Sequence, residues 1–169
     1  MSEAREWMIQ WLRDAHAMEE QAQTMLSGQA GRIENYPELK DRISRHLEET
    51  KEQAARLSRC LEQLGEDTSS LKDAGGKLTA IGQSLSGLFA GDEVMKGSLA
   101  SYTFEHMEIA SYGILIAAAN ALGEAEVARV CEENLREEEA MAQWLKEHVP
   151  ATTEQFLARA ASDADSAKR

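Results

Sequence analysis

Four long segments of this chain repeat apolar residues at steps of three and four, the spacing of an amphipathic helix. The segments cover residues 3 to about 26, 37–65, 93–122 and 124 to about 148, and Pro150 follows the last of them. The chain has only two prolines and 5% aromatic residues, so its core must be built from Ala, Leu, Ile and Met. We therefore predict an all-α protein.

The lengths of the connections predict how these helices are arranged. The first and second helices form one antiparallel hairpin, the third and fourth form another, and the long 65–91 connection joins the two. This is the up-down-down-up order of a ferritin-like four-helix bundle. Apolar spacing predicts a short crossover helix within 71–90, and Thr152 predicts the cap of a short C-terminal helix through Ala160. We expect a single bundle domain over 1–161 and a flexible polar tail over 162–169.

Charge excludes several classes of function. The sequence holds 30 acidic and 18 basic side chains, for a net charge of −12, which repels nucleic acids and anionic lipid but is compatible with metal cations. No secretory signal and no apolar run of about 20 residues occurs, so we expect a cytoplasmic protein that binds neither nucleic acid nor membrane. Cys60 and Cys131 are isolated in the sequence and are expected to be core thiols.

Several glutamates fall on the apolar faces of the predicted helices. Glu19, Glu105 and Glu138 lie in line with the apolar stripes of the first, third and fourth helices. Glu108 lies one turn beyond Glu105, at the edge of the same face, while Glu49 lies on the shoulder of the apolar face of the second helix. The sequence thus directs acidic groups from four helices toward one interior.

Ionised carboxylates buried without partners cost several kcal/mol each, so a set of this size requires positive charge. Two iron or manganese ions supply it, because these cations accept oxygen ligands in bundle cores. His46 lies near the centre of the second helix's apolar face and is a further candidate ligand, as is Gln53; a hydrogen-bonded core histidine is the alternative. The alternative for the glutamates is that chance placed them there and that they reach solvent.

Four motifs in order along the chain resemble the YciE/YciF group of bacterial ferritin-like stress proteins, the YciE branch especially. They are residues 12–19 (LRDAHAME), 46–50 (HLEET), 104–112 (FEHMEIASY) and the Glu137-Glu138 pair before Trp144-Leu145. The resemblance spans nearly the whole chain. It implies a ferritin-like bundle, a homodimer and a cytoplasmic protein of stress responses with no established reaction.

Carried onto this sequence, the resemblance implies a di-metal site at Glu19, Glu49, Glu105, Glu108 and Glu138. The Glu105/Glu108 pair also resembles that of rubrerythrins, which are peroxide-reducing di-iron proteins. The sequence departs from the wider di-iron pattern, because Glu52 and Met141 stand where that pattern has histidines. Only His46, one turn before Glu49, offers an imidazole.

Two functions remain open at this point. The first is metal-dependent redox chemistry with a small oxidant such as peroxide. The second is a non-enzymatic stress-protective or interaction bundle whose metal site is degenerate. Whether the protein is an enzyme is left open by the sequence.

Overall fold

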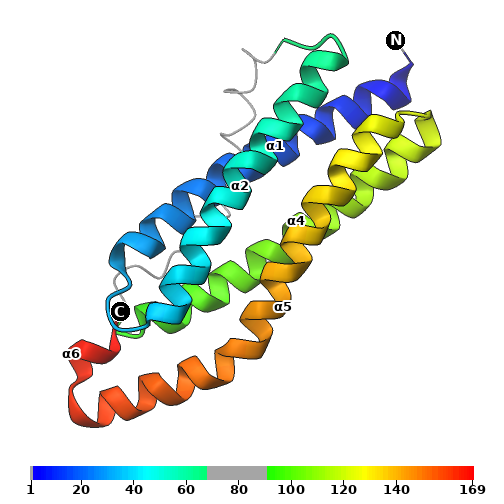
Figure 1. Ribbon diagram of the computed structural model, residues 1–169. Helices are drawn as coiled ribbons and strands as arrows, with labels where there is room; N and C mark the ends of the chain where they lie inside the picture. The colour runs from blue at the N-terminus through cyan, green and yellow to red at the C-terminus, as the bar shows by residue number, and fades with distance from the viewer. Residues whose placement is uncertain (1, 68–90) are drawn as a thin grey trace.

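The computed structural model describes residues 2–67 and 91–169. The helices in this part of the chain are α1 (Glu3–Arg32), α2 (Pro37–Gln63), α4 (Glu93–Leu122), α5 (Ala125–Ser162) and α6 (Ala164–Ala167). Figure 1 shows α1 and α2 as one antiparallel hairpin and α4 and α5 as a second, with α1 packed on α4 and α2 on α5. Because α2 ends at the opposite end of the bundle from where α4 begins, the predicted up-down-down-up topology is confirmed. The predicted crossover helix lies outside the described residues.

Local sequence explains three of the helix ends. The side chain of Ser2 accepts a hydrogen bond from the backbone nitrogen of Arg5 and caps α1. Pro37 begins α2 at the position where its missing N–H is not needed. Gly123 ends α4 with a φ of 74°, a left-handed conformation that glycine adopts without strain.

The first helix is longer than the sequence predicted. We expected it to stop near Gly28, but α1 continues to Arg32. Gln29 explains the difference, because its side-chain nitrogen donates to the carbonyl of Gly97 at 3.2 Å and its oxygen accepts from Ser101 at 2.9 Å. These bonds to α4 offset the cost of glycine within the helix, which is about 1 kcal/mol for each of Gly28 and Gly31.

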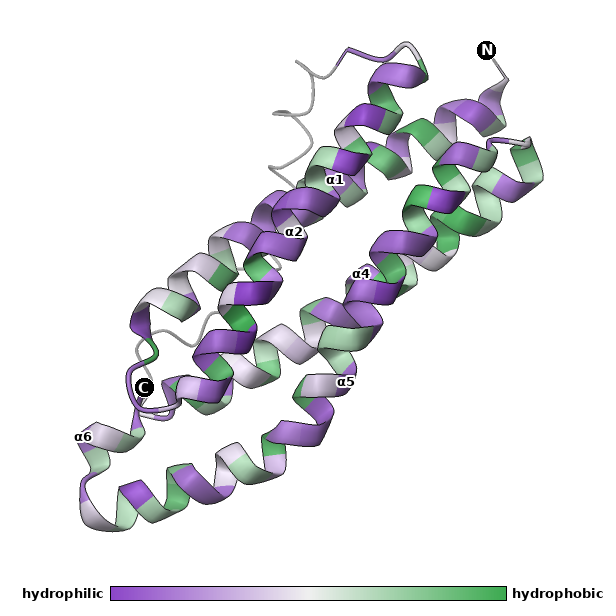
Figure 2. Ribbon diagram, viewed as in Figure 1, coloured by the Kyte–Doolittle hydropathy of each residue, from purple (hydrophilic) through white to green (hydrophobic). Residues whose placement is uncertain are grey.

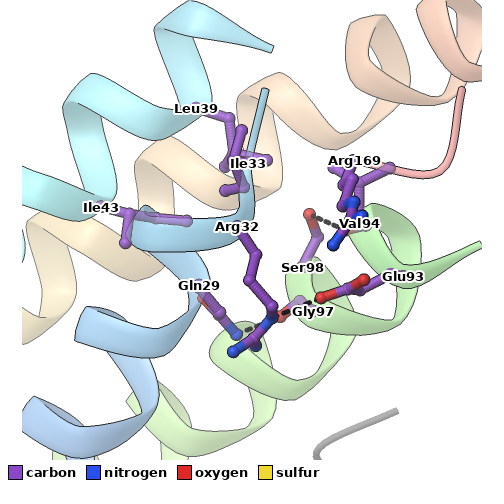
Figure 3. A pocket seen from close by; sticks show the side chains of 10 residues that line it. All are labelled: Gln29, Arg32, Ile33, Leu39, Ile43, Glu93, Val94, Gly97, Ser98 and Arg169. Atoms are coloured by element: carbon purple, nitrogen blue, oxygen red, sulfur yellow. Dashed lines mark hydrogen bonds and ion pairs between the residues drawn. The ribbon is translucent and has the colours of Figure 1, made fainter. Parts of the chain in front are cut away.

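Figure 3 shows the same end of α1 against α4, where the Arg32 guanidinium faces Glu93 at 2.5 Å. The cavity between them measures about 20 Å³. This volume holds about one water molecule. The cavity is therefore not a candidate for a ligand site.

The fourth long helix also runs past its predicted end. We expected Pro150 to stop it and a separate helix to follow from Thr152, but α5 is continuous to Ser162. Proline removes one backbone donor, and the helix bends in its C-terminal half, as Figure 1 shows. The hydroxyls of Thr152 and Thr153 donate to the carbonyls of His148 and Val149 at 3.0 and 2.8 Å, and bonds of this kind favour a bend in a helix.

The C-terminal residues are docked, whereas we expected a flexible tail over 162–169. Tyr36 donates its hydroxyl to the carbonyl of Ala167 at 2.6 Å, and the backbone nitrogen of Val94 donates to the carbonyl of Lys168 at 2.9 Å. Ala167 is only 1% exposed. The last residues of the chain therefore contact the starts of α2 and α4.

The core has two apolar clusters, one toward each end of the bundle. Figure 2 shows green apolar and purple polar residues alternating along the long helices. Along α2, buried polar residues separate Ile43 of one cluster from Leu57 of the other. Along α5, they separate Cys131 from Met141 in the same way. A band of polar side chains therefore crosses the middle of the bundle.

Candidate metal centre

The band, which we call the polar layer, draws on all four long helices. None of its side chains is more than 2% exposed. Its members are Glu19, His46, Thr50, Gln53, Glu105, Glu108, Asn134 and Glu138. Five of the six residues predicted to bind metal lie in it, all except Glu49.

His46 lies at the centre of the closest group in the layer. Its Nε2 atom is 3.1 Å from Glu105 Oε2 and 3.4 Å from Glu138 Oε2. One ligand atom from each of these three residues lies within 4.8 Å of the others. An imidazole and two carboxylates at this separation could hold one metal ion.

Glu49 lies outside the layer, with a side chain that is 29% exposed. Its Oε2 atom lies 2.7 Å from His46 Nδ1 and 3.3 Å from the Arg42 guanidinium. The structure therefore places Glu49 behind the imidazole rather than among the buried carboxylates. Its position on the shoulder of the helix, noted from the sequence, accounts for this.

A chain of hydrogen bonds fixes Glu19. Arg56 donates to Asn134 Oδ1 at 3.0 Å, Asn134 Nδ2 donates to the Tyr112 hydroxyl oxygen at 3.0 Å, and the Tyr112 hydroxyl donates to Glu19 Oε1. Arginine is only a donor, so each group in the chain has one possible orientation. The other oxygen of Glu19 is left to face the interior.

Sequence reasoning missed Asn134 and left Gln53 undecided. Asn134 lies four residues before Glu138, on the same stripe of α5, so its spacing could have identified it. Gln53 is fully buried, and its amide nitrogen donates to Glu137 Oε2 at 2.9 Å. This contact joins α2 to α5 at the edge of the polar layer.

The carboxyl groups of the layer compete for protons. Burial raises the pKa of Glu105 to about 8. Burial, and then the charges of neighbouring carboxylates, raise the pKa of Glu19 and of Glu108 well above 4.5. Burial also acts to raise the pKa of Glu138, but the adjacent Glu105 carboxyl and His46 imidazole outweigh it and hold this pKa at about 2.

The pKa of the His46 imidazole depends on the same carboxyl groups. Burial by itself would lower the pKa of His46, but the charge of Glu105 and hydrogen bonds to its carboxylate neighbours raise it well above 6.5. The 3.4 Å between His46 Nε2 and Glu138 Oε2 suits an ion pair but exceeds the usual length of an N–H···O hydrogen bond. His46 and Glu138 are therefore joined as an ion pair.

The polar layer contains more hydrogen-bond acceptors than donors. This imbalance indicates whether a metal ion would fit the site. Eight buried polar side-chain atoms in the described part of the chain have no hydrogen-bond partner. Five of them belong to the layer: Glu19 Oε2, Gln53 Oε1, Glu108 Oε1 and both oxygens of Glu138. All five are oxygen acceptors, each costing about 1–3 kcal/mol when left unsatisfied. Hard cations that prefer oxygen ligands satisfy this set, so a bound metal ion fits the residues present.

Other features match the expectations from the sequence. Cys60 and Cys131 are free and buried, and burial raises the pKa of their thiols to about 11 and about 12. Among the described residues, every helix is too short or too polar to cross a membrane. The homodimer that the resemblance implies stays a prediction.

Comparisons with known proteins agree with this fold. The model of a family described as DUF892, a domain of unknown function, matches residues 3–158. A crystal structure of a protein from Xanthomonas campestris pv. campestris is similar with a TM-score of 0.78 and 46% identity, over 93% of this chain and 98% of that one.

Two further solved structures are similar. YcfI from Rhodopseudomonas palustris has a TM-score of 0.69 and 27% identity, over 86% of this chain and 94% of its own. The E. coli stress protein YciF has a TM-score of 0.67 and 25% identity, over 88% of this chain and 96% of its own. The resemblance to YciF-like proteins that the sequence motifs indicated is confirmed.

Proposed function

This chain belongs to the DUF892 family of YciF-like helical bundles, and on that premise we propose that it is a ferritin-like stress protein with a di-metal centre. The polar layer holds two iron or manganese ions. The protein uses them in redox chemistry with peroxide or dioxygen. The link to stress rests on the similarity to YciF.

The five unpartnered oxygen acceptors in the polar layer are the observation that carries this proposal. When ionised, Glu19, Glu105, Glu108 and Glu138 carry four negative charges. Two divalent cations balance that charge, and His46 contributes a neutral ligand. The carboxyl groups whose pKa values are raised hold protons in the metal-free protein. Metal binding releases these protons, because a carboxylate must be deprotonated to bind.

The residues around the layer have separate tasks. Glu49 accepts the Nδ1 proton of His46, which leaves Nε2 free to bind metal. Tyr112 holds Glu19 in one orientation. The apolar clusters on both sides of the layer exclude bulk water. Bound iron or manganese supplies the electron-transfer chemistry, while the protein fixes its ligands and limits access.

The first test is elemental analysis of protein purified without chelator and then incubated with Fe²⁺ or Mn²⁺. We expect about two ions per chain in wild type, a loss of bound metal in Glu138→Gln, and peroxide consumption that follows metal content. Glu139→Gln is the matched control, because Glu139 is the exposed neighbour of Glu138 on α5. A wild-type protein that retains no metal after this treatment would contradict the proposal.

Thermal unfolding gives a second, independent measurement. Metal that binds only the folded state stabilises it by about 2.7 kcal/mol at a hundredfold excess over its dissociation constant. We expect an increase of this kind for wild type with Mn²⁺ and a much smaller one for Glu138→Gln. An unchanged melting temperature in wild type would instead support the non-enzymatic alternative.

A further inference from the structure

Gln53 is a fully buried amide whose two ends are in different surroundings. It lies on α2, two helical turns after His46, and its side chain has no exposed surface. The amide nitrogen donates to Glu137 Oε2 at 2.9 Å. The amide oxygen has no hydrogen-bond partner. A buried carbonyl oxygen without a partner is costly and requires an explanation.

The orientation of this amide follows from its neighbours. Glu137 also accepts two hydrogen bonds from Arg56, at 3.1 and 2.9 Å, and this ion pair marks it as an ionised carboxylate. An ionised carboxylate only accepts, so the nitrogen of Gln53 must face Glu137. Turning the amide over would place two oxygens in contact. The oxygen of Gln53 therefore does not face Glu137, and it is buried.

The partner for this oxygen must be a donor or a cation. The other unpartnered atoms of the layer are carboxyl oxygens, which only accept in the ionised form that metal binding requires. The donors Arg56 and Asn134 are engaged elsewhere, in the chain that leads to Tyr112. A cation within the layer satisfies the Gln53 oxygen and the carboxylates together.

The spacing along α2 assigns this oxygen to a different ion from the one beside His46. Seven residues of helix correspond to about 10.5 Å along the axis. Two metal ions that share carboxylates lie only about 3.5–4 Å apart. Side chains that start two turns apart therefore approach such a pair from opposite ends. His46 lies with Glu105 and Glu138, and Gln53, which is close enough to Glu138 to lower the pKa of that carboxyl, starts two turns further along α2.

We propose that Gln53 Oε1 is a direct ligand of the second metal ion, as a neutral oxygen donor beside the four carboxylates. This inference rests on the proposed di-metal function and deepens it. A neutral donor at this position keeps the charge of the site balanced, whereas a fifth carboxylate would leave one excess negative charge. The bond from Glu137 positions the amide before metal arrives.

The test is calorimetric titration of metal-free protein with Mn²⁺. Wild type is expected to bind two ions. Gln53→Leu, which keeps the volume but removes the oxygen, is expected to weaken one of the two by at least tenfold and to leave the other within about twofold. Glu52→Gln is the matched control, because Glu52 is the exposed neighbour of Gln53 on α2 and pairs with Arg59 outside the polar layer. It is expected to bind both ions as wild type does.

A purely structural role for Gln53 makes a different prediction. If the amide served only to hold Glu137, Gln53→Leu would bind both ions as wild type does, whatever its effect on the melting temperature of the metal-free protein. A metal ligand at this position instead requires that one ion bind more weakly.

The outcomes separate the two proposals. Two ions bound with wild-type affinity in Gln53→Leu would overturn the assignment of this ligand and leave the di-metal centre intact. Wild type that binds no Mn²⁺ would overturn the metal centre and this inference with it. Should Gln53→Leu fail to fold, Gln53→Asn keeps the amide but withdraws its oxygen by one methylene, and the same tenfold weakening of one ion is expected. Unchanged binding in that variant would also overturn the assignment.

Discussion

Glu49 Oε2 lies 2.7 Å from His46 Nδ1, so a partly exposed carboxylate orients a buried imidazole. The other ring nitrogen faces Glu105 and Glu138. Carboxylates in this position fix the ring and increase its basicity as a metal ligand. Glu49 is thus a positioning residue for His46.

Replacing Glu49 tests this role. Glu49→Gln is expected to lower the affinity for Mn²⁺ by about 10–100-fold without changing the number of ions bound, because the ligand remains but is less well oriented. Calorimetric titration measures both quantities. Glu48→Gln, at an exposed position paired with Lys51, serves as the control. A reduced number of bound ions in Glu49→Gln would show instead that Glu49 is itself a ligand, as the sequence predicted.

The metal-free protein is expected to lose stability between pH 6.5 and 8.5. The pKa values of Glu19, Glu105, Glu108 and His46 are raised in the folded state. In this range the folded protein holds protons that the unfolded chain has released, so stability falls as pH rises through the folded pKa values. For a pKa near 8, as in Glu105, the loss is about 2 kcal/mol, since each pH unit below that pKa corresponds to about 1.4 kcal/mol.

The site residues whose pKa values are lowered do not reverse this loss of stability with rising pH. The pKa values of Glu138 and Glu49 are lowered, so their contribution is lost only as pH falls below 4.5. Urea unfolding of chelator-treated protein at the two pH values measures the change. Saturating Mn²⁺ should reduce or reverse it, because a bound cation favours the ionised carboxylates. Greater stability of the metal-free protein at pH 8.5 would contradict the assignment of protons to the polar layer.

Removal of the Tyr112 hydroxyl is expected to destabilise the fold. Tyr112→Phe leaves Glu19 Oε1 without its donor and Asn134 Nδ2 without its acceptor, both in the buried layer. Buried polar groups left in this way cost about 1–3 kcal/mol each. Urea unfolding at pH 7 provides the measurement, and Tyr102→Phe, whose ring packs edge-on against His106, provides the comparison. Equal stability of wild type and Tyr112→Phe would argue against the Arg56–Asn134–Tyr112–Glu19 chain.

The two thiols are expected to resist modification in the native protein. Burial raises the pKa of Cys60 to about 11 and that of Cys131 to about 12, so almost no thiolate forms at neutral pH. Labelling with a thiol reagent, followed by mass spectrometry, should proceed at the rate of unfolding and become fast only in denaturant. Rapid labelling of either cysteine in buffer would show that the core opens more readily than this packing indicates.

The long helices and their topology could be predicted from the sequence because the pattern that determines them is local. Helix ends were harder, since contacts between distant residues decide them. The bonds from Gln29 to α4 carry α1 past Gly28, and docking against Tyr36 orders the residues near Ala167. Neither partner lies near the affected residue in the sequence.

The residues of the candidate site also differ in how well the sequence predicts them. Helical periodicity identified the glutamates of the polar layer, because a charge on an apolar face is conspicuous. It left Gln53 only a candidate ligand, since a neutral amide near the centre of an apolar face is less conspicuous than a charge. The direction of that amide depends on Glu137 and Arg56 together, and only the packing of α2 on α5 brings the three into contact.

The hydrogen bond between Tyr36 and Ala167 joins residues that are 131 positions apart. Contacts between such distant residues form slowly, because most of the chain must already be ordered before they can be made. The helical hairpins can therefore assemble first, while this end of the bundle closes last. Variants shortened before residue 164 should consequently reach a bundle-like state at near-normal speed and yet remain frayed where α2 and α4 begin.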